Sequence, residues 1–388
     1  MISTKNRNDR FVRKPALSEL LFLDAATMGY SMGQHAILKI DRAPSLAQLE
    51  QALEASMAQA GNLDLCFDSG VWLRAEDPCP CHLVESDCED IFQVPLPHID
   101  HARHTLWLQA IHLRPCDQWY LRFTLSHCAG DGISLVNFLY LFFAALGQTP
   151  MMPCHFGIQE HDFTKVVKRK PFSVPLRPVC QPPVGATAPQ YYHKRTEQAP
   201  YLPTATLCHL TASCFSHSKA IMLVPLGLRR YCPAQDDLIM GNLVLPLFLD
   251  AAHQDVDQIH RKIHTFATDN RLPVFGKLPV TVYRAIPGRL RRGVLDLYIR
   301  WIRRSKKVPV AALVSNVGKI QSALLENPYF RVEDCYVAFQ NLPVFALTLI
   351  SVSMDDHTNI CFSTHDSPIS QEAAQALAHR IPTTLQIP

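Results

Sequence analysis

The first half of the chain shows hydrophobic patterns that change between helical and strand periodicity. Helical patterns cover residues 17–26 and 45–60, the latter opening on a capping-box pattern of Ser45 and Gln48, and the apolar residues 133–146 have a helical length. Alternating apolar and polar positions predict strands at residues 32–40, 63–67, 71–75, 106–113 and 119–125. The last four strands form two hairpins, because short turn-forming segments join each pair.

The second half follows a proline-rich stretch, residues 148–204, over most of which regular structure is not expected. We interpret this stretch as a crossover linker between two halves. Beyond it, apolar runs predict strands at residues 205–211, 221–226, 243–249, 308–315, 345–353 and 359–364. Helices are predicted at residues 256–269, 284–304 and 370–379. The mixture predicts an α/β protein.

The composition indicates a globular protein with two domains. With 388 residues, the chain is too long for one ordinary core and suits two domains of about 190 residues each. Hydrophobic residues make up 48%, but the longest apolar segment, residues 133–146, has only about 14 residues and suits a buried helix better than a membrane helix. Asp24 interrupts an apolar run near the N-terminus, which is then too short for a signal peptide. These patterns predict a cytoplasmic protein.

Cysteine usage and net charge argue against several classes of function. The thirteen cysteines are irregularly spaced in a long chain, so reduced thiols are expected rather than a disulfide scaffold. Cys79, Cys81 and His82 look like half of a zinc pattern, but no second pair with ligand spacing follows, and no metal is expected. The net charge of +3 is too small to indicate nucleic acid, and no glycine-rich phosphate loop occurs.

A short segment between a predicted strand and a predicted helix is the strongest candidate for chemistry. It runs from Ser126 to Gly132, and in it His127 stands four residues before Asp131. A tight loop between a strand end and a helix start can aim side chains into a cleft from a rigid base. The alternative is that Asp131 only caps the following helix and that His127 is one of 18 histidines without a special role.

This segment resembles the HHxxxDG signature of the chloramphenicol-acetyltransferase-like acyltransferases. That superfamily includes peptide-synthetase condensation domains, and the resemblance here is nearest to the alcohol acetyltransferase, wax ester synthase and polyketide-associated acyltransferase types. In the signature the second histidine is the general base, and His127 matches it. Asp131 and Gly132 match the aspartate and the glycine, which would hold the loop, whereas Ser126 replaces the first histidine.

The resemblance implies a fold and a domain organisation. The expected fold is a two-lobed α/β sandwich of two chloramphenicol-acetyltransferase-like halves with a central tunnel, and His127 would lie near the middle of that tunnel. Residues 1–147 would form the N-terminal half that carries the motif. Residues 148–204 would be the linker, and residues 205–388 the C-terminal half.

The resemblance also implies roles for residues outside the motif. In the family the motif aspartate pairs with an arginine and shapes the loop, and Arg229 and Arg230, which follow a strand end, are the candidates here. Ser315 and Asn316 end a predicted strand and are candidates, with Ser126, for binding substrate. The alternative for Arg229 and Arg230 is that both are surface arginines. The alternative for Ser315 and Asn316 is a turn that only ends the strand.

The implied reaction moves an acyl group from an acyl thioester to a small alcohol or amine. The donor would be acyl-CoA or an acyl carrier protein. His127 would accept the proton of the attacking group, because an imidazole with a pKa of about 6.5 is largely neutral at pH 7. The reaction needs no covalent enzyme intermediate, and no metal or redox cofactor is implied.

A non-catalytic relative that binds a ligand or a partner is the alternative from another functional class. In the family two helices usually separate the first two strands of the second half, whereas only residues 212–220 lie between the strands predicted here. The absence of these helices, which wall the tunnel, and the presence of Ser126 favour a binding protein. Retention of His127 and Asp131 favours an enzyme, for which a peptide-synthetase-type condensation domain is a further alternative.

A strongly basic segment runs from Arg289 to Lys307, with Asp296 as its one acidic residue. Apolar residues at helical spacing give it an apolar side. A basic amphipathic helix of this kind can lie on an anionic membrane surface, which would make the protein peripheral to a membrane. It can also bind an acidic carrier protein or the phosphates of coenzyme A. The alternative is a packed helix whose charged face is solvated.

Overall fold

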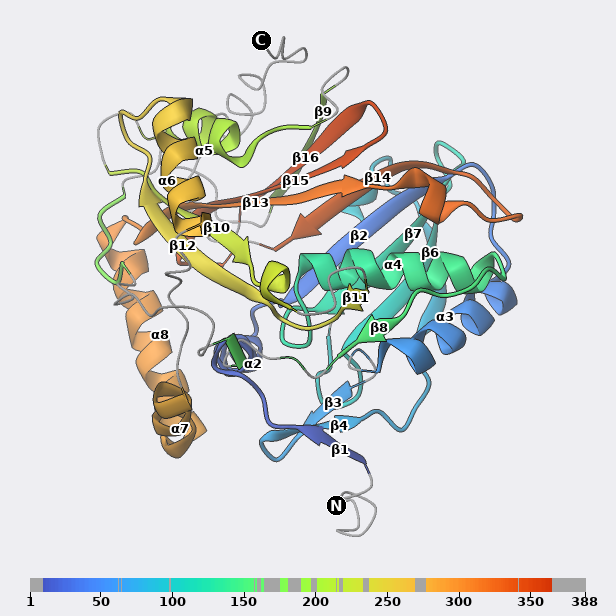
Figure 1. Ribbon diagram of the computed structural model, residues 1–388, viewed down its shortest axis with the longest axis horizontal. Helices are drawn as coiled ribbons and strands as arrows, with labels where there is room; N and C mark the ends of the chain where they lie inside the picture. Colours follow the sequence, from blue (N-terminus) through green and yellow to red (C-terminus); the bar gives the residue numbers. More distant parts are fainter. Residues whose placement is uncertain are drawn as a thin grey trace. The chain divides into compact units, whose positions relative to one another are not determined.

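The computed structural model in Figure 1 divides the chain into two compact units, which we describe separately. Unit 1 consists of Met1–Glu160, Arg229–Leu243 and Gln321–Cys335, and unit 2 of His161–Leu228, Val244–Ile320 and Tyr336–Pro388. The structure describes residues 10–61, 63, 65–97, 99–156, 158, 162–163, 175–180, 190–196, 201–213, 215, 219–232, 237–268, 277–340 and 342–364.

A five-stranded mixed sheet forms the centre of unit 1, which contains the first half of its edge strand β14 (Val332–Phe339). In spatial order the strands of the sheet are β14, β2 (Gly33–Ile40), β7 (Gln118–Ser126), β6 (Leu106–Leu113) and β5 (Cys81–Ser86). β7 is antiparallel to both of its neighbours, whereas β5 is parallel to β6. The sequence predicted β2, β6 and β7 but missed β5 and β14.

Two helices pack side by side along this sheet, as Figure 1 shows. They are α3 (Leu46–Ala60) and α4 (Gly132–Leu146). α4 is apolar because most of its circumference is buried. The rings of Phe138 and Phe142 lie against Phe123 of β7, with ring centroids 6.4 and 4.9 Å apart. The strand before the motif loop and the helix after it therefore share one aromatic core.

Smaller elements complete unit 1. A three-stranded sheet has the order β1 (Phe11–Arg13), β4 (Val71–Arg74) and β3 (Leu65–Asp68), and the predicted hairpin joins its last two strands. The predicted helix near the N-terminus is α2 (Leu17–Thr27). The remaining elements are η1 (Ile91–Gln93), β8 (Cys154–His155), η3 (Arg229–Tyr231), β11 (Leu238–Ile239) and η4 (Ser322–Leu325).

Unit 2 contains a six-stranded mixed sheet. Its spatial order is β12 (Val244–Asp250), β10 (Ile221–Gly227), β13 (Val310–Ile320), β15 (Phe345–Met354), β16 (His357–Thr364) and β9 (Gln190–Thr196). β13 is parallel to β10 and β15, and the other pairs are antiparallel. The helices of this unit are α5 (Thr204–Ala212), α6 (Val256–Thr268), α7 (Lys277–Ala285) and α8 (Gly288–Ser305).

The prediction of a strand at residues 205–211 is wrong, because this segment forms helix α5. Its buried residues are Ala205, Leu207, Cys208, Thr211 and Ala212. Their spacing of three and four residues places them on one helical face, although the short run also fits alternation. The element that precedes β10 is therefore a helix, α5, and β9 is the strand before it. The interval of residues 212–220, which the sequence left between two strands, lies instead between α5 and β10.

The proline-rich stretch contains more regular structure than expected. β9 pairs along its length with β16, and β8 pairs with β11. The single helix predicted at residues 284–304 is two helices, because Pro287, which cannot donate a backbone hydrogen bond, is the N-cap of α8. Ser45 begins α3 without the predicted side-chain cap bond. The helix predicted at residues 370–379 lies outside the described residues, and the central tunnel stays a prediction.

Within the described part of the chain, no helix combines the length and the apolar character needed to cross a membrane.

Candidate functional site

The motif loop, residues 126–132, connects β7 to α4 within unit 1. Ser126 is the last residue of β7 and pairs with Gly33 of β2. Its carbonyl oxygen accepts hydrogen bonds from the backbone N–H groups of Ala129 and Gly130, which turns the chain sharply. The side-chain amide of Gln34 on β2 donates to the Gly130 carbonyl at 2.6 Å. The loop is therefore tied to the neighbouring strand as well as to its own.

His127 is held through its backbone on both sides. Its N–H donates to the Met32 carbonyl at 2.7 Å, and its own carbonyl accepts from the side-chain amide of Asn242 at 3.1 Å. Its ring lies against the ring of Phe22 on α2, with centroids 4.4 Å apart. The residue remains partly accessible to solvent. Burial of the imidazole lowers the pKa of His127, and the nearby Asp131 carboxylate only partly opposes this effect.

Asp131 is buried and pairs with Arg229 in bidentate geometry. The Nη1 and Nη2 atoms of Arg229 donate to the two carboxylate oxygens at 2.8 and 2.7 Å. Backbone N–H groups of Ser134 and Leu243 donate to the same carboxylate, each at 2.9 Å, and Asp131 is the N-cap of α4. Burial alone raises the pKa of Asp131, but Arg229 and the two N–H donors outweigh it and hold the pKa below its ordinary value.

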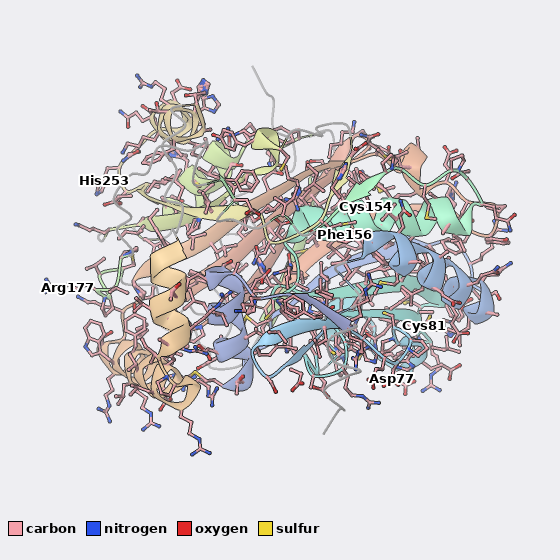
Figure 2. All side chains as sticks on the ribbon, turned by 60° about the horizontal axis from the view of Figure 1, so that its bottom comes forward. Asp77, Cys81, Cys154, Phe156, Arg177 and His253 are labelled. Carbon is pink, nitrogen blue, oxygen red and sulfur yellow. The ribbon has the colours of Figure 1, made fainter. Side chains whose placement is uncertain are left out.

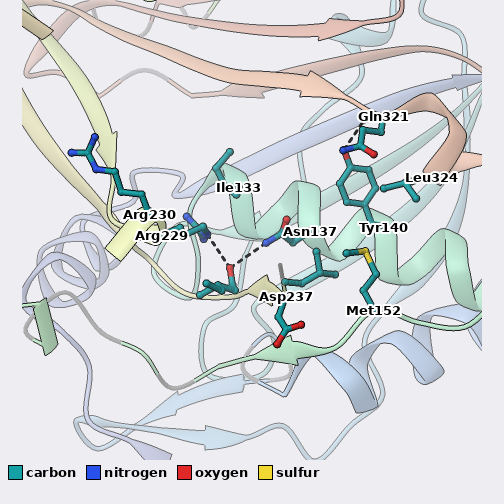
Figure 3. A pocket seen from close by; sticks show the side chains of 11 residues that line it. Ile133, Asn137, Tyr140, Met152, Arg229, Arg230, Asp237, Gln321 and Leu324 are labelled. Carbon is teal, nitrogen blue, oxygen red and sulfur yellow. Dashed lines mark hydrogen bonds between the residues drawn. The ribbon is translucent and has the colours of Figure 1, made fainter. Parts of the chain in front are cut away.

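Ser134 extends this ion pair into a network that the sequence did not predict. Its hydroxyl donates to the Gly241 carbonyl at 2.8 Å and accepts from the Gly241 N–H and from Arg229, each at 2.9 Å. Arg229 also donates through Nε to the Ile239 carbonyl at 2.9 Å (Figure 3). Gly241 has a φ of +138°, which few other residues adopt. The motif loop and residues 239–243 are thereby joined in one buried arrangement.

Ser126 occupies the position of the first histidine of the signature, and a different histidine contacts it. Its buried hydroxyl lies 2.7 Å from Nε2 of His101 and accepts from the N–H of Cys128 at 3.2 Å. His101 precedes β6, and its carbonyl accepts from the N–H of Phe67 at 2.6 Å. No local sequence signal marks His101, because its contact with Ser126 requires the folded loops. The prediction that Ser126 binds substrate stays a prediction.

Arg230 does not contact Asp131. It is exposed, and its guanidinium lies over the Tyr231 ring, 4.8 Å from the centroid. With Arg229 it lines a pocket of about 590 Å³ beside α4, to which Asn137 and Tyr140 also contribute (Figure 3). Asn137 donates to the Ile239 carbonyl at 3.2 Å, so this pocket shares a wall with the ion-pair network. His127 does not line the pocket.

Ser315 and Asn316 belong to β13 in unit 2. The amide of Asn316 donates to the Leu202 carbonyl at 2.7 Å, and its side-chain oxygen accepts from the N–H of Gly318 at 2.9 Å. Both polar atoms of this side chain thus bind the backbone of their own unit. Ser315 is partly exposed. A role of these two residues in substrate binding stays a prediction.

Cys79, one of the three residues that look like half of a zinc pattern, lines a second pocket. This pocket of about 820 Å³ in unit 1 lies beside α3 and is lined by Asp77, Cys79 and Phe156, among others. Figure 2 labels Asp77 and Phe156 of this lining. Burial raises the pKa of the Cys81 thiol to about 12, so that it is not a ready thiolate ligand. Among the residues that the structure describes, no group of three or more histidine, cysteine or acidic side chains could hold a metal ion.

No protein-family model and no curated protein matches the sequence. Solved structures do match over nearly the whole chain. Polyketide synthase associated protein 5 from Mycobacterium tuberculosis has a TM-score of 0.58 at 15% identity, with 97% of this chain and 99% of that chain covered. A mutant starter condensation domain of rhizomide synthetase has a TM-score of 0.61 at 13% identity, with 97% and 95% covered.

The X-domain from teicoplanin biosynthesis has a TM-score of 0.57 at 14% identity, with 95% of this chain and 92% of that chain covered. At such identities the likeness concerns the fold. It agrees with the α/β fold that the motif around His127 led us to expect. The chain therefore has the two-lobed α/β fold of these condensation-domain structures.

Proposed function

We propose that this protein transfers an acyl group from an acyl thioester to a hydroxyl or amine, with His127 as the general base. The observation that carries the proposal is the state of the His127 imidazole. His127 is fixed through its backbone to Met32 and Asn242, and the residue remains partly accessible to solvent. Its ring lies against Phe22, and burial lowers the pKa of the imidazole. A neutral imidazole at pH 7 can accept a proton from an attacking group.

In the proposed reaction the acceptor attacks the thioester carbonyl while His127 removes its proton. A new bond forms between the carbonyl carbon and the acceptor oxygen or nitrogen. The carbon–sulfur bond then breaks, and the leaving thiolate takes the proton back from the imidazolium. The products are an ester or amide and a free thiol, so the imidazole is regenerated without a covalent enzyme intermediate.

Asp131 and Arg229 act as positioning residues in this proposal. Their bidentate ion pair fixes the beginning of α4 and the end of the loop that carries His127. Gly132 follows the buried carboxylate directly and is the first residue of α4. No cofactor is proposed. The donor is acyl-CoA or an acyl carrier protein, and the fold shared with peptide-synthetase condensation domains supports a carrier as donor.

The decisive experiment is a screen of acyl-CoA donors against a panel of alcohols and amines, with release of free thiol as the readout. Carrier-bound acyl groups are tested in parallel by mass spectrometry of the carrier. Once a productive pair is found, we expect His127→Ala to lower turnover by at least about 10²-fold, the usual effect of losing a general base. His82→Ala is the matched control, since His82 is an exposed histidine of the same unit.

Near-full turnover by a folded His127→Ala variant would show that His127 is not the base. If no donor releases thiol with any acceptor, although acyl thioesters bind, the non-catalytic binding protein becomes the better description.

The pH dependence of the reaction gives an independent test. Protonation of His127 removes the base, so kcat/KM falls as the pH falls through the pKa of this residue. Because burial lowers that pKa, we expect the acidic limb of the profile to lie below pH 6.5, the ordinary value for histidine. A limb with its midpoint above pH 6.5 would contradict the role assigned to the buried His127 ring.

A further inference from the structure

Helix α8 carries two apolar faces, and only one of them is covered. Ile299 and Ile302 are each 3% exposed, and Ile302 belongs to the hydrophobic core of unit 2. A second apolar stripe faces outward, and its members Leu290, Val294, Leu297 and Trp301 are 58, 61, 66 and 48% exposed. Their spacing of four, three and four residues places them on one line along about three turns. An exposed, continuous apolar stripe of this kind indicates an interaction surface.

A row of arginines accompanies this stripe. At 100° per residue, Arg289, Arg300 and Arg304 lie along one flank of the apolar line, and all three are exposed. Asp296 is the one acidic residue from Arg289 to Lys307, and it pairs with Arg300 at 2.6 Å. The segment as a whole has eight basic residues. Arg304 therefore borders the apolar line closely, and Arg289 and Arg300 lie about a quarter of a turn from it.

Arg291 links α8 to α7 at the point where one helix follows the other. The guanidinium of Arg291 donates to the Tyr283 carbonyl at 3.1 Å and lies over the Tyr283 ring, 4.7 Å from the centroid. This arginine serves the turn between the helices, which distinguishes it from the exposed row. The outward stripe thus lies on a helix whose beginning contacts α7.

We propose that α8 docks this protein on an anionic lipid surface, with the helix axis in the plane of the interface. Leu290, Val294, Leu297 and Trp301 enter the boundary between headgroups and acyl chains, and the arginine row binds lipid phosphates. Apolar residues including tryptophan on one side, with arginines around them, are the composition of interfacial helices. The proposal is independent of the proposed function, because α8 contains no residue of the motif loop.

The charge pattern favours lipid over a second copy of this chain. Two copies of α8 packed through their stripes would place arginine rows near each other, with Asp296 as the one carboxylate in each segment to offset them. Like charges across a helix pair oppose association. An anionic surface neutralises the same charges, and each basic residue near such a surface adds to binding.

The test uses the full-length protein with phosphatidylcholine vesicles and with vesicles that also contain phosphatidylserine. Trp301 is a local probe, since Trp72 and Trp107 are buried and Trp119 is stacked on His112. We expect brominated acyl chains in the anionic vesicles to quench the emission of Trp301. Trp301→Phe should lose this quenching and still sediment with the vesicles.

Two double variants separate the charged and apolar contributions. Arg300→Gln with Arg304→Gln should weaken sedimentation with anionic vesicles by at least about tenfold at low salt. Arg261→Gln with Lys262→Gln on α6 removes the same number of exposed charges and should leave binding unchanged. Val294→Gln with Leu297→Gln should also weaken binding, whereas Leu83→Gln, at an exposed leucine of unit 1, should not.

Several outcomes would overturn the proposal. Absence of vesicle binding, or equal binding by wild type and the α8 variants, excludes α8 as a lipid-docking surface. Concentration-dependent dimerisation that Leu297→Gln abolishes would assign the stripe to a second copy. Binding to an acidic carrier protein without binding to vesicles would assign it to a protein partner.

Discussion

The arginines of the motif network and those of α8 share a chemistry but differ in their surroundings. The Arg229 side chain is 16% exposed, and its donors reach Asp131, Ser134 and two backbone carbonyls. The Arg300 side chain is 63% exposed and has a single carboxylate partner four residues earlier on the same helix. The first guanidinium joins segments 98 residues apart, whereas the second bridges one helical turn.

The two arginines differ in the free energy needed to bury the charge and in how much their ion pairs contribute to stability. A buried charge must be paired and fully hydrogen-bonded, so removal of one partner leaves the other uncompensated in a poor solvent for charge. An exposed ion pair is screened by water and salt and contributes little to stability. We therefore expect the Asp131–Arg229 network to affect folding and the α8 row to affect binding.

The largest effect on stability should follow from breaking the buried pair. Asp131→Asn leaves Arg229 without its carboxylate and should lower the free energy of unfolding of unit 1 by about 3–5 kcal/mol. Activity should fall with it if the pair positions His127. Urea unfolding in a Trp301→Phe background measures this, because the remaining tryptophans, at 72, 107 and 119, all belong to unit 1. Arg230→Gln is the matched control.

Arg230 is exposed, so its replacement should change stability by no more than about 0.5 kcal/mol. If Asp131→Asn and Arg230→Gln lower the free energy of unfolding equally, the buried ion pair is no more important for stability than an exposed arginine. If the Asp131→Asn variant is fully stable, the only structural role that remains for the Asp131 side chain is to cap α4.

His35 extends the comparison to a buried group that is neutral. Burial, aided by the Arg122 charge, lowers the pKa of His35 to about 3, so the unfolded chain binds a proton below pH 6.5 that the folded chain does not. The stability from this group is complete above pH 6.5 and is lost as the pH falls from 6.5 toward 3. Between pH 6.5 and 5 this amounts to about 2 kcal/mol.

Urea unfolding of the wild type and of His35→Gln at several pH values would measure this loss. The variant should lose this part of the pH dependence, whereas His82→Gln, at an exposed histidine, should keep it. An unchanged slope in His35→Gln would show that the buried imidazole takes up its proton in the folded protein.

Ser134 provides a smaller test of the same network. Ser134→Ala removes the hydroxyl that binds the Gly241 N–H, the Gly241 carbonyl and Arg229, and should cost about 1–3 kcal/mol. Ser18→Ala is a suitable control, because the buried hydroxyl of Ser18 has no hydrogen-bond partner among the described residues. If both variants lose equal stability, the Ser134 bonds add nothing beyond packing.

The motif loop was predictable because its information is contiguous. The strand before it, the loop and the helix after it follow one another within residues 118–146, and each has its own periodicity. The sequence narrowed the partner of Asp131 to two neighbouring arginines, but only the fold distinguishes them, since Arg229 turns inward and Arg230 outward. His101 could not be predicted, because its contact with Ser126 depends on two loops meeting in space.

The wrong predictions also arise where contacts between distant parts of the chain decide the structure. The short run that forms α5 fits both periodicities, and tertiary burial selects the helix. β9 lies inside a proline-rich stretch, and its partner β16 is remote in sequence. For α8 the sequence predicted one apolar side, but which of two apolar faces is covered depends on the rest of unit 2.

The smallest effect on stability is expected for the exposed arginines of α8. Arg300→Gln with Arg304→Gln should change the free energy of unfolding by no more than about 0.5 kcal/mol, because the i,i+4 pair of Arg300 with Asp296 is solvent-exposed. The double substitution should instead weaken lipid binding. This effect should shrink as salt rises, because charges are screened over about 8 Å at physiological ionic strength. Thermal unfolding and vesicle sedimentation at two salt concentrations measure the two quantities on the same protein. A stability loss as large as that of Asp131→Asn would mean that this row, too, holds the fold together. A salt-independent loss of lipid binding would instead mean that the substitutions had altered the shape of α8 rather than its charge.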